Sequence, residues 1–242
     1  MKDSFDNEIY GSPFSGGYWR SAITSLGKLR LFTMVALLTA FAILSETYFI
    51  PLSREIKISY TFIPIALCAV IGGPYLTVIC CIIEDMLGVI LSGQTVFAGY
   101  ILSTVLTGLI YSFFFYRSHF SFKRIVFAKL IDNLFVNVLL GAVWRKHYFD
   151  YPIPLALGVS GIKNLIMLPL EVFILSLAFS SLYTPLKRTK LVPQRTESSL
   201  NRERLIETVL ILILCIAVSV AIILLYGYYK APIDNFIKQI LA

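Results

Sequence analysis

The sequence has few charged residues and no motif that supports catalysis. Only 14% of its 242 residues are Asp, Glu, Lys or Arg, and it contains two histidines, His119 and His147. The phosphate-binding loop GxxxxGK[ST], the zinc motif HExxH and the nucleophile elbow GxSxG are all missing. We therefore expect that this protein is not an enzyme.

The four cysteines are not spaced as a metal site or as a disulfide framework. Cys68, Cys80, Cys81 and Cys215 all lie in apolar runs, and no two of them form a CxxC pair. A free cysteine in such a run behaves as a small apolar residue. We expect no metal, no disulfide and no cofactor in this chain.

What the chain does contain is long, continuous apolar runs. Hydrophobic residues make up 57% of the sequence, and the mean hydropathy is +0.80. Several runs approach the roughly 20 residues that a helix needs to cross a bilayer. Because the runs are continuous rather than alternating, they predict an all-α fold, a polytopic helical bundle in a membrane.

The apolar runs divide the chain into four parts. We expect a cytoplasmic N-terminal tail (1–30), a six-helix membrane domain (31–186), a basic cytoplasmic linker (187–204), and an extra transmembrane helix with an external tail (205–242). Within the membrane domain, the expected spans are 31–50, 57–72, 75–91, 97–116, 125–143 and 155–183. The second and third spans are short and are joined by Gly72-Gly73-Pro74, which is typical of interrupted helices that line a cavity.

Ionisable residues inside these spans mark a candidate site, because a charge in hydrocarbon costs roughly several kcal/mol unless it faces protein, a partner ion or water. Lys57, Glu84 and Asp85 lie in the second and third spans. The fifth span carries four polar residues whose spacings of three and four place them on one helix face: Lys129, Asp132, Asn133 and Asn137. An alternative for this face is a local ion pair with hydrogen bonds between helices.

The basic residues indicate the orientation. Fourteen of the 21 Lys and Arg residues lie in segments 1–30, 117–129 and 187–204, which share one side of the membrane if the six spans alternate. Basic loops stay in the cytoplasm, so we expect a cytoplasmic N-terminus and a multi-pass protein of the cell membrane. The polar, aromatic loops near 51–57, 92–97 and 144–153 are then external. Together, these loops form a plausible mouth of an external polar pocket. Because the sequence shows no motif for ATP hydrolysis, we expect a solute-binding protein that depends on a partner for energy.

Eight short motifs carry a family resemblance. In chain order they are IKISYTFIPI at 56–65, GGP at 72–74, EDMLG at 84–88, FAGY at 97–100, LTGLIY at 106–111, Trp144, IKNL at 162–165 and LP at 168–169. In this combination, over about residues 31–183, the chain resembles the folate family of substrate-binding (S) components of energy-coupling factor (ECF) transporters.

This resemblance implies six helices around a vitamin site that opens to the outside. It also implies a partner module of one transmembrane coupling subunit and two cytoplasmic ATPase subunits, which hydrolyse the ATP. Ala36 and Ala40, a pair of small residues on one helix face, would dock on the coupling subunit. The substrate would be folate or a related small solute. Its binding pocket would be lined by Lys57, Tyr60, Asp85, Gln94, Tyr100, Trp144, Lys163 and Asn164.

Two other classes of function stay open. A membrane scaffold or assembly protein would use its polar residues only to join helices, would bind no ligand, and would tolerate Lys57→Ala together with Asp85→Ala. An integral membrane enzyme would need a catalytic group that the sequence does not show. Glu84 and Asp85 are adjacent carboxylates, but neighbours in a helix point about 100° apart and do not easily share one substrate.

Overall fold

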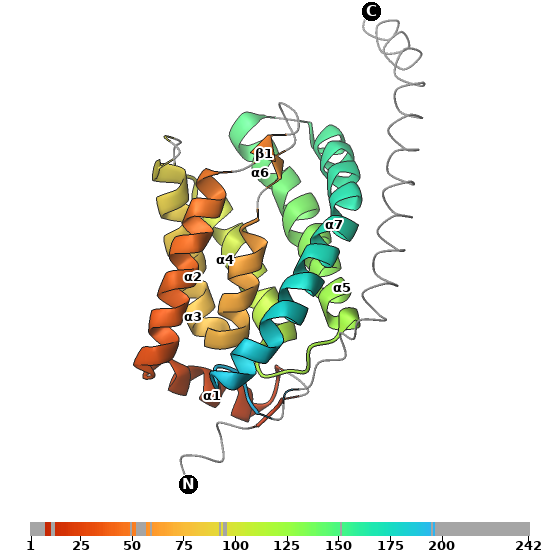
Figure 1. Ribbon diagram of the computed structural model, residues 1–242. Coiled ribbons are helices and arrows are strands. Elements are labelled where there is room, and N and C mark those ends of the chain that lie inside the picture. The colour runs from red at the N-terminus through yellow and green to blue at the C-terminus, as the bar shows by residue number, and fades with distance from the viewer. Residues whose placement is uncertain are drawn as a thin grey trace, which may run out of the picture.

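The computed structural model describes residues 8–10, 13–48, 50–51, 57–58, 60–91, 93, 96–150, 152–194 and 196. They form a helical bundle with one short pair of strands (Figure 1). In order, the elements are α1 (Gly16–Leu26), α2 (Leu29–Thr47), β1 (Ile50–Pro51), β2 (Lys57–Ile58), α3 (Phe62–Leu91), α4 (Ala98–Phe115), α5 (Phe122–Ile131), the π-helix η2 (Asp132–Leu140), α6 (Gly141–Phe149) and α7 (Ile153–Arg188). The predicted all-α class is confirmed. The predicted extra helix in 205–242 lies outside the described residues.

Five helical stretches of the described chain are long and apolar enough to cross a membrane. They are Leu29–Thr47, Phe62–Leu91, Ala98–Phe115, Phe122–Tyr148 and Met167–Arg188. The second stretch consists of two arms that run in opposite directions (Figure 1). Counting these arms separately gives the six-helix core that the sequence predicts, and the chain is a multi-pass membrane protein.

The turn between the two arms of α3 lies where the Gly-Gly-Pro sequence predicted a hinge. Gly73 has φ +73°, a conformation that favours glycine, and a Cβ there would lie 2.9 Å from the ring of Tyr116. The Sγ atoms of Cys68 and Cys80, twelve residues apart in the sequence, lie 3.4 Å from one another. A straight helix would rise about 18 Å over that stretch, so the chain must fold back.

The first arm of α3 is shorter than predicted. Lys57, the expected start of the second span, lies in β2, and the helix begins at Phe62. The arm from Phe62 to Gly72 is roughly 16 Å long, about half of the hydrocarbon thickness. Its N-terminus therefore lies at mid-depth in the bundle, which brings Thr61 and Phe62 into the interior.

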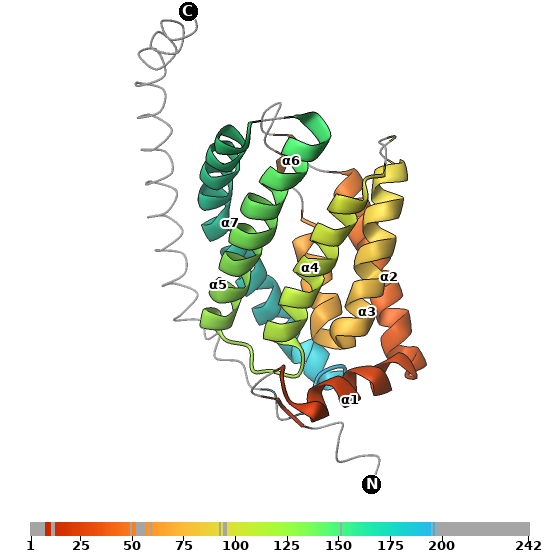
Figure 2. The ribbon, with the colours of Figure 1, turned by 180° about the vertical axis from the view of Figure 1, so that it is seen from behind.

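The two ends of the bundle differ. Helix α1, which the sequence analysis did not predict within its N-terminal tail, lies across one end (Figures 1 and 2). The Tyr18 hydroxyl of α1 donates to the Ser112 carbonyl at 2.8 Å, and its ring packs edge-on against Tyr116. Strand β1, the C-terminal ends of α2, α3 and α6, and the start of α4 lie at the opposite end. The bundle is thus closed by packed aromatic rings at the α1 end.

Candidate functional site

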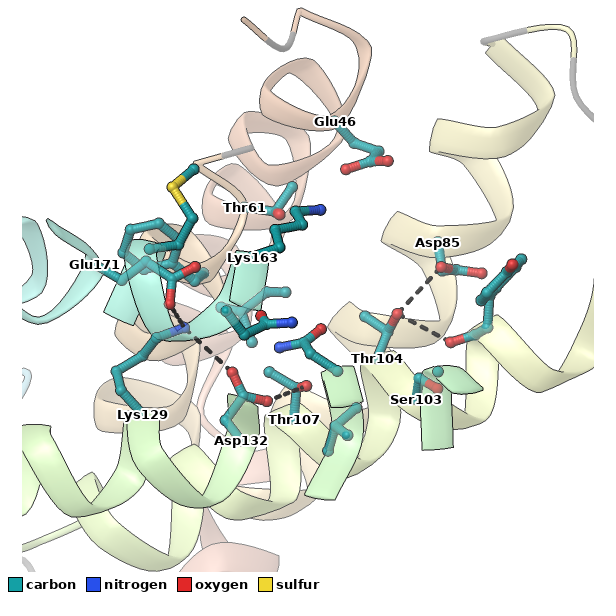
Figure 3. A pocket seen from close by; sticks show the side chains of 18 of the residues that line it. Glu46, Thr61, Asp85, Ser103, Thr104, Thr107, Lys129, Asp132, Lys163 and Glu171 are labelled. Carbon is teal, nitrogen blue, oxygen red and sulfur yellow. Dashed lines mark hydrogen bonds and ion pairs between the residues drawn. The ribbon is translucent and has the colours of Figure 1, made fainter. Parts of the chain in front are cut away.

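A cavity of about 490 Å³ lies within the bundle, between α3, α4, η2, α6 and α7 (Figure 3). This volume falls within the range of roughly 300–1,000 Å³ that small-molecule sites occupy. Its lining is rich in charge, with eight ionisable side chains: Glu46, Glu84, Asp85, Lys129, Asp132, Arg145, Lys163 and Glu171. Because the surrounding helices are those of a membrane domain, so many charges mark a candidate ligand site.

The structure brings together most of the site residues predicted from the sequence. Five of the eight line the cavity, from four different helices: Asp85, Tyr100, Trp144, Lys163 and Asn164. Tyr60 lies just before the cavity-lining Thr61, and its carbonyl accepts from the Ile63 amide at 3.0 Å as α3 begins. The contact of these residues with a ligand stays a prediction.

Two predicted residues are not placed in the site by the structure. Only the backbone of Lys57 is described, in β2, and Gln94 lies outside the described residues.

An aromatic wall faces the cavity from α4 and α6. The Trp144 indole nitrogen donates to Ser103 Oγ at 2.9 Å, which orients the ring. The indole lies against Gly99, where a Cβ would be 2.8 Å from Trp144 Cδ2. The ring of Phe97 contacts those of Tyr100 and Trp144, with centroids 5.3 and 5.7 Å apart. These contacts fix the positions of the Tyr100 and Trp144 rings on the cavity wall.

On the inner wall, a polar network surrounds Lys129, which is 2% exposed. Its Nζ lies 3.2 Å from Asp132 Oδ2 and 3.1 Å from Glu171 Oε2. The hydroxyls of Tyr111 and Thr107 donate to the two oxygens of Asp132, at 3.0 and 2.6 Å. Figure 3 shows this chain of contacts from Glu171 to Thr107. The local ion pair considered for the fifth span is therefore present, and it also forms part of the cavity wall.

The fifth span contains a feature that its sequence did not predict, the π-helix η2. Such helices are rare and frequently occur at functional sites. Here η2 begins at Asp132, within the network around Lys129, and it contributes Val136 and Asn137 to the cavity lining. Continuing without a break into α6, it leads to Trp144 and Arg145 on the same cavity.

A second acidic group lies on the α2–α3 side of the cavity. It consists of Glu46, Glu84 and Asp85, and we call it the outer acidic cluster. Glu46 packs over Gly88, where a Cβ would be 3.1 Å from Glu46 Cγ. Asp85 Oδ1 accepts from Thr104 Oγ1 at 3.1 Å (Figure 3). Glu84 is 3% exposed, and its Oε2, like Asp85 Oδ2, has no hydrogen-bond partner among the residues that the structure describes.

Sequence reasoning missed a large part of the lining. The missed polar residues include Glu46, Thr61, Ser103, Thr104, Thr107, Arg145 and Glu171. Those on α4 had a detectable signal, because Tyr100, Thr104 and Thr107 recur at spacings of four and three and so share one helix face. Glu46 also had a signal, because it is an ionisable residue inside the predicted span 31–50.

The predicted docking residues lie on the outer face of α2. Ala36 and Ala40 are exposed, whereas their neighbours Val35 and Thr39 are buried against the rest of the bundle. The small-residue face is therefore accessible to a partner helix. Docking itself stays a prediction.

Comparison with known proteins identifies relatives of this fold. No family model matches the chain. Over 121 residues it is 28% identical to the folate transporter FolT of Clostridium novyi (strain NT), a match that covers 50% of this chain and 70% of that protein. The crystal structure of FolT bound with folic acid matches with a TM-score of 0.57 and 25% identity, over 61% of this chain and 91% of that chain. The predicted resemblance to the folate family of S components is confirmed.

One FolT relative is a folate transporter and the other is bound with folic acid, and neither name refers to catalysis. This favours the expectation that the chain is not an enzyme. The structural match covers 91% of that FolT chain, so nearly the whole FolT fold is similar to part of this chain. The cavity therefore lies in a fold that accommodates folic acid in a relative.

Proposed function

We propose that the chain is the substrate-binding membrane subunit of an ECF-type importer, and that it captures folate or a related vitamin-sized solute outside the cell. The observation that carries this proposal is the charged, aromatic cavity of about 490 Å³ inside a membrane bundle that resembles FolT bound with folic acid. The chain supplies binding, and ATP hydrolysis belongs to partner subunits.

The cavity walls suit the parts of such a solute. Tyr100 and Trp144 offer ring faces on which a flat heterocycle stacks. Lys163 and Arg145, from α7 and α6, offer cations to carboxylates of the solute. The Asn164 amide donates one N–H to the Ser160 carbonyl at 2.8 Å, so its second N–H and its side-chain oxygen are left to meet the solute.

Delivery requires a coupling subunit and two ATPase subunits in the cytoplasm. The exposed Ala36 and Ala40 support a docking face on α2 for the coupling subunit. At the closed end of the bundle, Arg20 belongs to α1, Arg117 to the turn between α4 and α5, and Arg124 to the first turn of α5. A cytoplasmic closed end agrees with the positive-inside bias and leaves the other end external.

Folic acid binding to the purified, detergent-solubilised chain tests the binding proposal. We expect titration calorimetry to detect binding, native mass spectrometry to show a bound mass, and Lys163→Met to weaken the affinity by about tenfold or more. Lys146→Met is the matched control, because Lys146 is exposed at the end of α6 and pairs with Asp150. If folic acid binds neither to the wild type nor to either variant, the result favours the scaffold alternative.

Vitamin uptake in cells that carry the partner module tests the docking proposal. We expect Ala36→Trp or Ala40→Trp to abolish uptake while leaving folic acid binding unchanged, because a large ring would hold the two helices apart. Leu134→Trp, on the exposed face of η2, serves as the control and should transport normally. Normal uptake by both alanine variants would remove α2 from the docking face.

A further inference from the structure

Helix α1 lies across the closed end of the bundle, where α2 begins and α4 ends (Figures 1 and 2). Its 11 residues span roughly 16 Å, about half of the hydrocarbon thickness, so it does not cross the membrane. Because it lies across the ends of membrane-spanning helices, its axis runs along the membrane surface. The side chains on its outer faces then decide whether those faces meet lipid or water.

Contacts on the inner face fix how α1 is rotated about its axis. The Tyr18 hydroxyl donates to the Ser112 carbonyl at 2.8 Å. The hydroxyls of Ser21 and Ser25 lie 3.3 and 2.9 Å from the Tyr116 hydroxyl. Tyr18, Ser21 and Ser25 are all buried. The direction of every other side chain on α1 follows from this anchoring.

An apolar stripe runs along one outer side of α1. Trp19, Ile23 and Leu26 recur at spacings of four and three, which places them on one helix face. We call these three residues the α1 stripe; Ile23 is 56% exposed and Leu26 is 40% exposed. Arg20 and Thr24, both exposed, share the next face. The outer side of α1 is therefore amphipathic, the pattern of a helix that lies at a membrane surface.

The α1 stripe continues onto a surface that spans the membrane. The Trp19 ring packs edge-on against Tyr75 of α3 and Phe113 of α4, with centroids 5.8 and 6.1 Å apart. Tyr75 is partly exposed, and exposed apolar side chains follow it along the same face of α3 at Ile79 and Ile83. This part of α3 crosses the membrane, so those side chains meet acyl chains. Lipid that covers α3 therefore reaches Trp19, and tryptophan and tyrosine are enriched at this boundary of the membrane.

The same end of the bundle carries a concentration of positive charge. Each of the segments 13–30, 116–124 and 187–194 contains three Lys or Arg residues and no Asp or Glu. They include α1, the turn between α4 and α5, and the end of α7, which lie together at the closed end (Figures 1 and 2). Anionic phospholipids attract basic side chains at a membrane surface, so this charge favours an anionic headgroup layer over a neutral one.

We propose that α1 is an interfacial helix that binds the surface of an anionic membrane. The α1 stripe inserts among the acyl chains just beneath the headgroups, and basic residues of the closed end meet lipid phosphates. The site is the outer side of α1 together with the adjoining ends of α3 and α4. This inference goes beyond the proposed function and does not depend on which solute the cavity binds.

Trp19 is a reporter within the protein, because Trp144→Phe leaves it as the only tryptophan of the chain. This variant is reconstituted into vesicles whose lipids carry bromine, a fluorescence quencher, either near the headgroup or near the bilayer centre. We expect bromine near the headgroup to quench Trp19 at least about twice as strongly as bromine at the centre. Stronger quenching by central bromine, or none by either lipid, would overturn the inference.

Trp19→Phe supplies the reference for this measurement, because its remaining fluorescence comes from Trp144 on the cavity wall. If Trp144→Phe is poorly folded, the difference between the wild type and Trp19→Phe gives the quenching of Trp19 instead. The same two comparisons of bromine depth then decide the result.

Ile23→Glu and Thr24→Glu form a matched pair, since they add the same charge at neighbouring exposed positions of α1. We expect Ile23→Glu to lower the quenching of Trp19 by headgroup-proximal bromine by about half or more, because a carboxylate is costly among acyl chains. Thr24→Glu, on the polar face, should leave the quenching unchanged. Equal effects of the two variants would overturn the inference.

The preference for anionic lipid is measured with brominated phosphatidylglycerol and brominated phosphatidylcholine, each at the same fraction in unlabelled phosphatidylcholine. We expect the anionic lipid to quench Trp19 about twofold more strongly, and this excess to disappear at high salt. Arg20→Gln combined with Arg30→Gln should lower the excess, whereas Lys146→Gln, at the end of α6, should not. Equal quenching by the two lipids at low salt would overturn the anionic partner.

The two proposals fail separately. Folic acid binding by the wild type reports on the cavity, and lipid quenching of Trp19 reports on α1. A chain that binds folic acid but shows no quenching by lipid would lose the interfacial helix alone. A chain that shows the expected quenching but binds no folic acid would lose the folate proposal alone.

Discussion

Two groups of acids on opposite walls of one cavity have very different surroundings. Around Lys129, the carboxylates of Asp132 and Glu171 are held by an amine at 3.2 and 3.1 Å and by neighbouring hydroxyls and amides. In the outer acidic cluster, Glu84 and Asp85 each keep an oxygen without a partner. Acidic side chains thus have hydrogen-bond and ion-pair partners on one wall, whereas on the other wall two of them each have an oxygen without a partner among the described residues.

Local sequence explains one contact in this comparison, the ion pair between Lys129 and Asp132. Asp132 follows Lys129 by three residues, which places both on one helix face, and α4 adds Tyr111 and Thr107. Near Glu84, one helical turn away in either direction, are Cys80 and Gly88, neither of which carries a charge. We infer that the first group stabilises the bundle, whereas the second leaves two carboxylate oxygens without a partner among the described residues.

Removal of the central amine should have the largest effect on stability. Lys129→Met leaves the buried Asp132 and the partly buried Glu171 without their cation, so we expect the free energy of unfolding to fall by about 3–5 kcal/mol. Denaturant unfolding in detergent, followed by near-UV circular dichroism, measures this loss. Lys146→Met, which breaks an exposed pair, is the control. If Lys129→Met and Lys146→Met lose similar amounts of unfolding free energy, burial does not make the Lys129 ion pairs stronger than the Lys146–Asp150 pair.

A smaller effect is expected from Tyr111→Phe. The buried Tyr111 hydroxyl donates to Asp132 and accepts from Lys129 at 2.9 Å, so its loss removes two hydrogen bonds to charged groups. We expect about 1.5–3 kcal/mol of destabilisation by the same unfolding measurement. Tyr75→Phe, at the exposed surface of α3, should be near neutral. An unchanged Tyr111→Phe would show that the network does not depend on this hydroxyl.

The outer acidic cluster should respond in the opposite direction. Glu84→Gln removes a buried acid whose Oε2 has no hydrogen-bond partner among the described residues, so the ligand-free chain should become more stable by about 1 kcal/mol. Thermal unfolding without added ligand measures this gain, with Asp150→Asn as the reference. A clear loss of stability would instead place Glu84 among the structural acids.

The exposed pair Lys146–Asp150 should show the smallest effect. A hydrogen bond from Lys146, and then its charge, hold the pKa of Asp150 below its usual range. Because this folded-state pKa lies below the unfolded one, the stabilisation is present above the unfolded pKa, about 3.9, and is lost as the pH falls through the folded value.

The Asp150 side chain is 89% exposed, so solvent screens its ion pair with Lys146. The thermal unfolding midpoints of wild type and Asp150→Asn should therefore nearly coincide at about pH 7. At about pH 3 any small difference should shrink further, because Asp150 is then partly protonated in the wild type as well. A difference that grows toward low pH would contradict this sign.

The hinge was the most predictable feature of the fold. Gly72, Gly73 and Pro74 interrupt an apolar run too long for one span, and the structure turns there with a positive φ at Gly73. In contrast, the late start of α3 at Phe62 was not predicted, although residues 57–61 read KISYT and include three polar residues. The pairing of Lys57 with Pro51 across the two strands decides that start.

Part of the site was also predictable. Asp85, Lys163 and Asn164 were found because polar groups in apolar spans are conspicuous, and Trp144 because its motif resembles that of a family. Glu46 was missed, although it is an acid inside the predicted span 31–50. Its place beside Glu84 depends on how α2 packs over Gly88.

The sequence by itself determined the membrane class, the helical core, the hinge and a set of polar residues that hydrocarbon does not tolerate alone. Those properties follow from apolar run length, glycine and proline stereochemistry, and the cost of buried charge, all of which are local. Only the tertiary structure decided which acids have partners, because Tyr111, Thr107 and Glu171 reach Lys129 and Asp132 from other helices. The incomplete coordination of Glu84 is likewise a property of the packed bundle and not of its sequence neighbours.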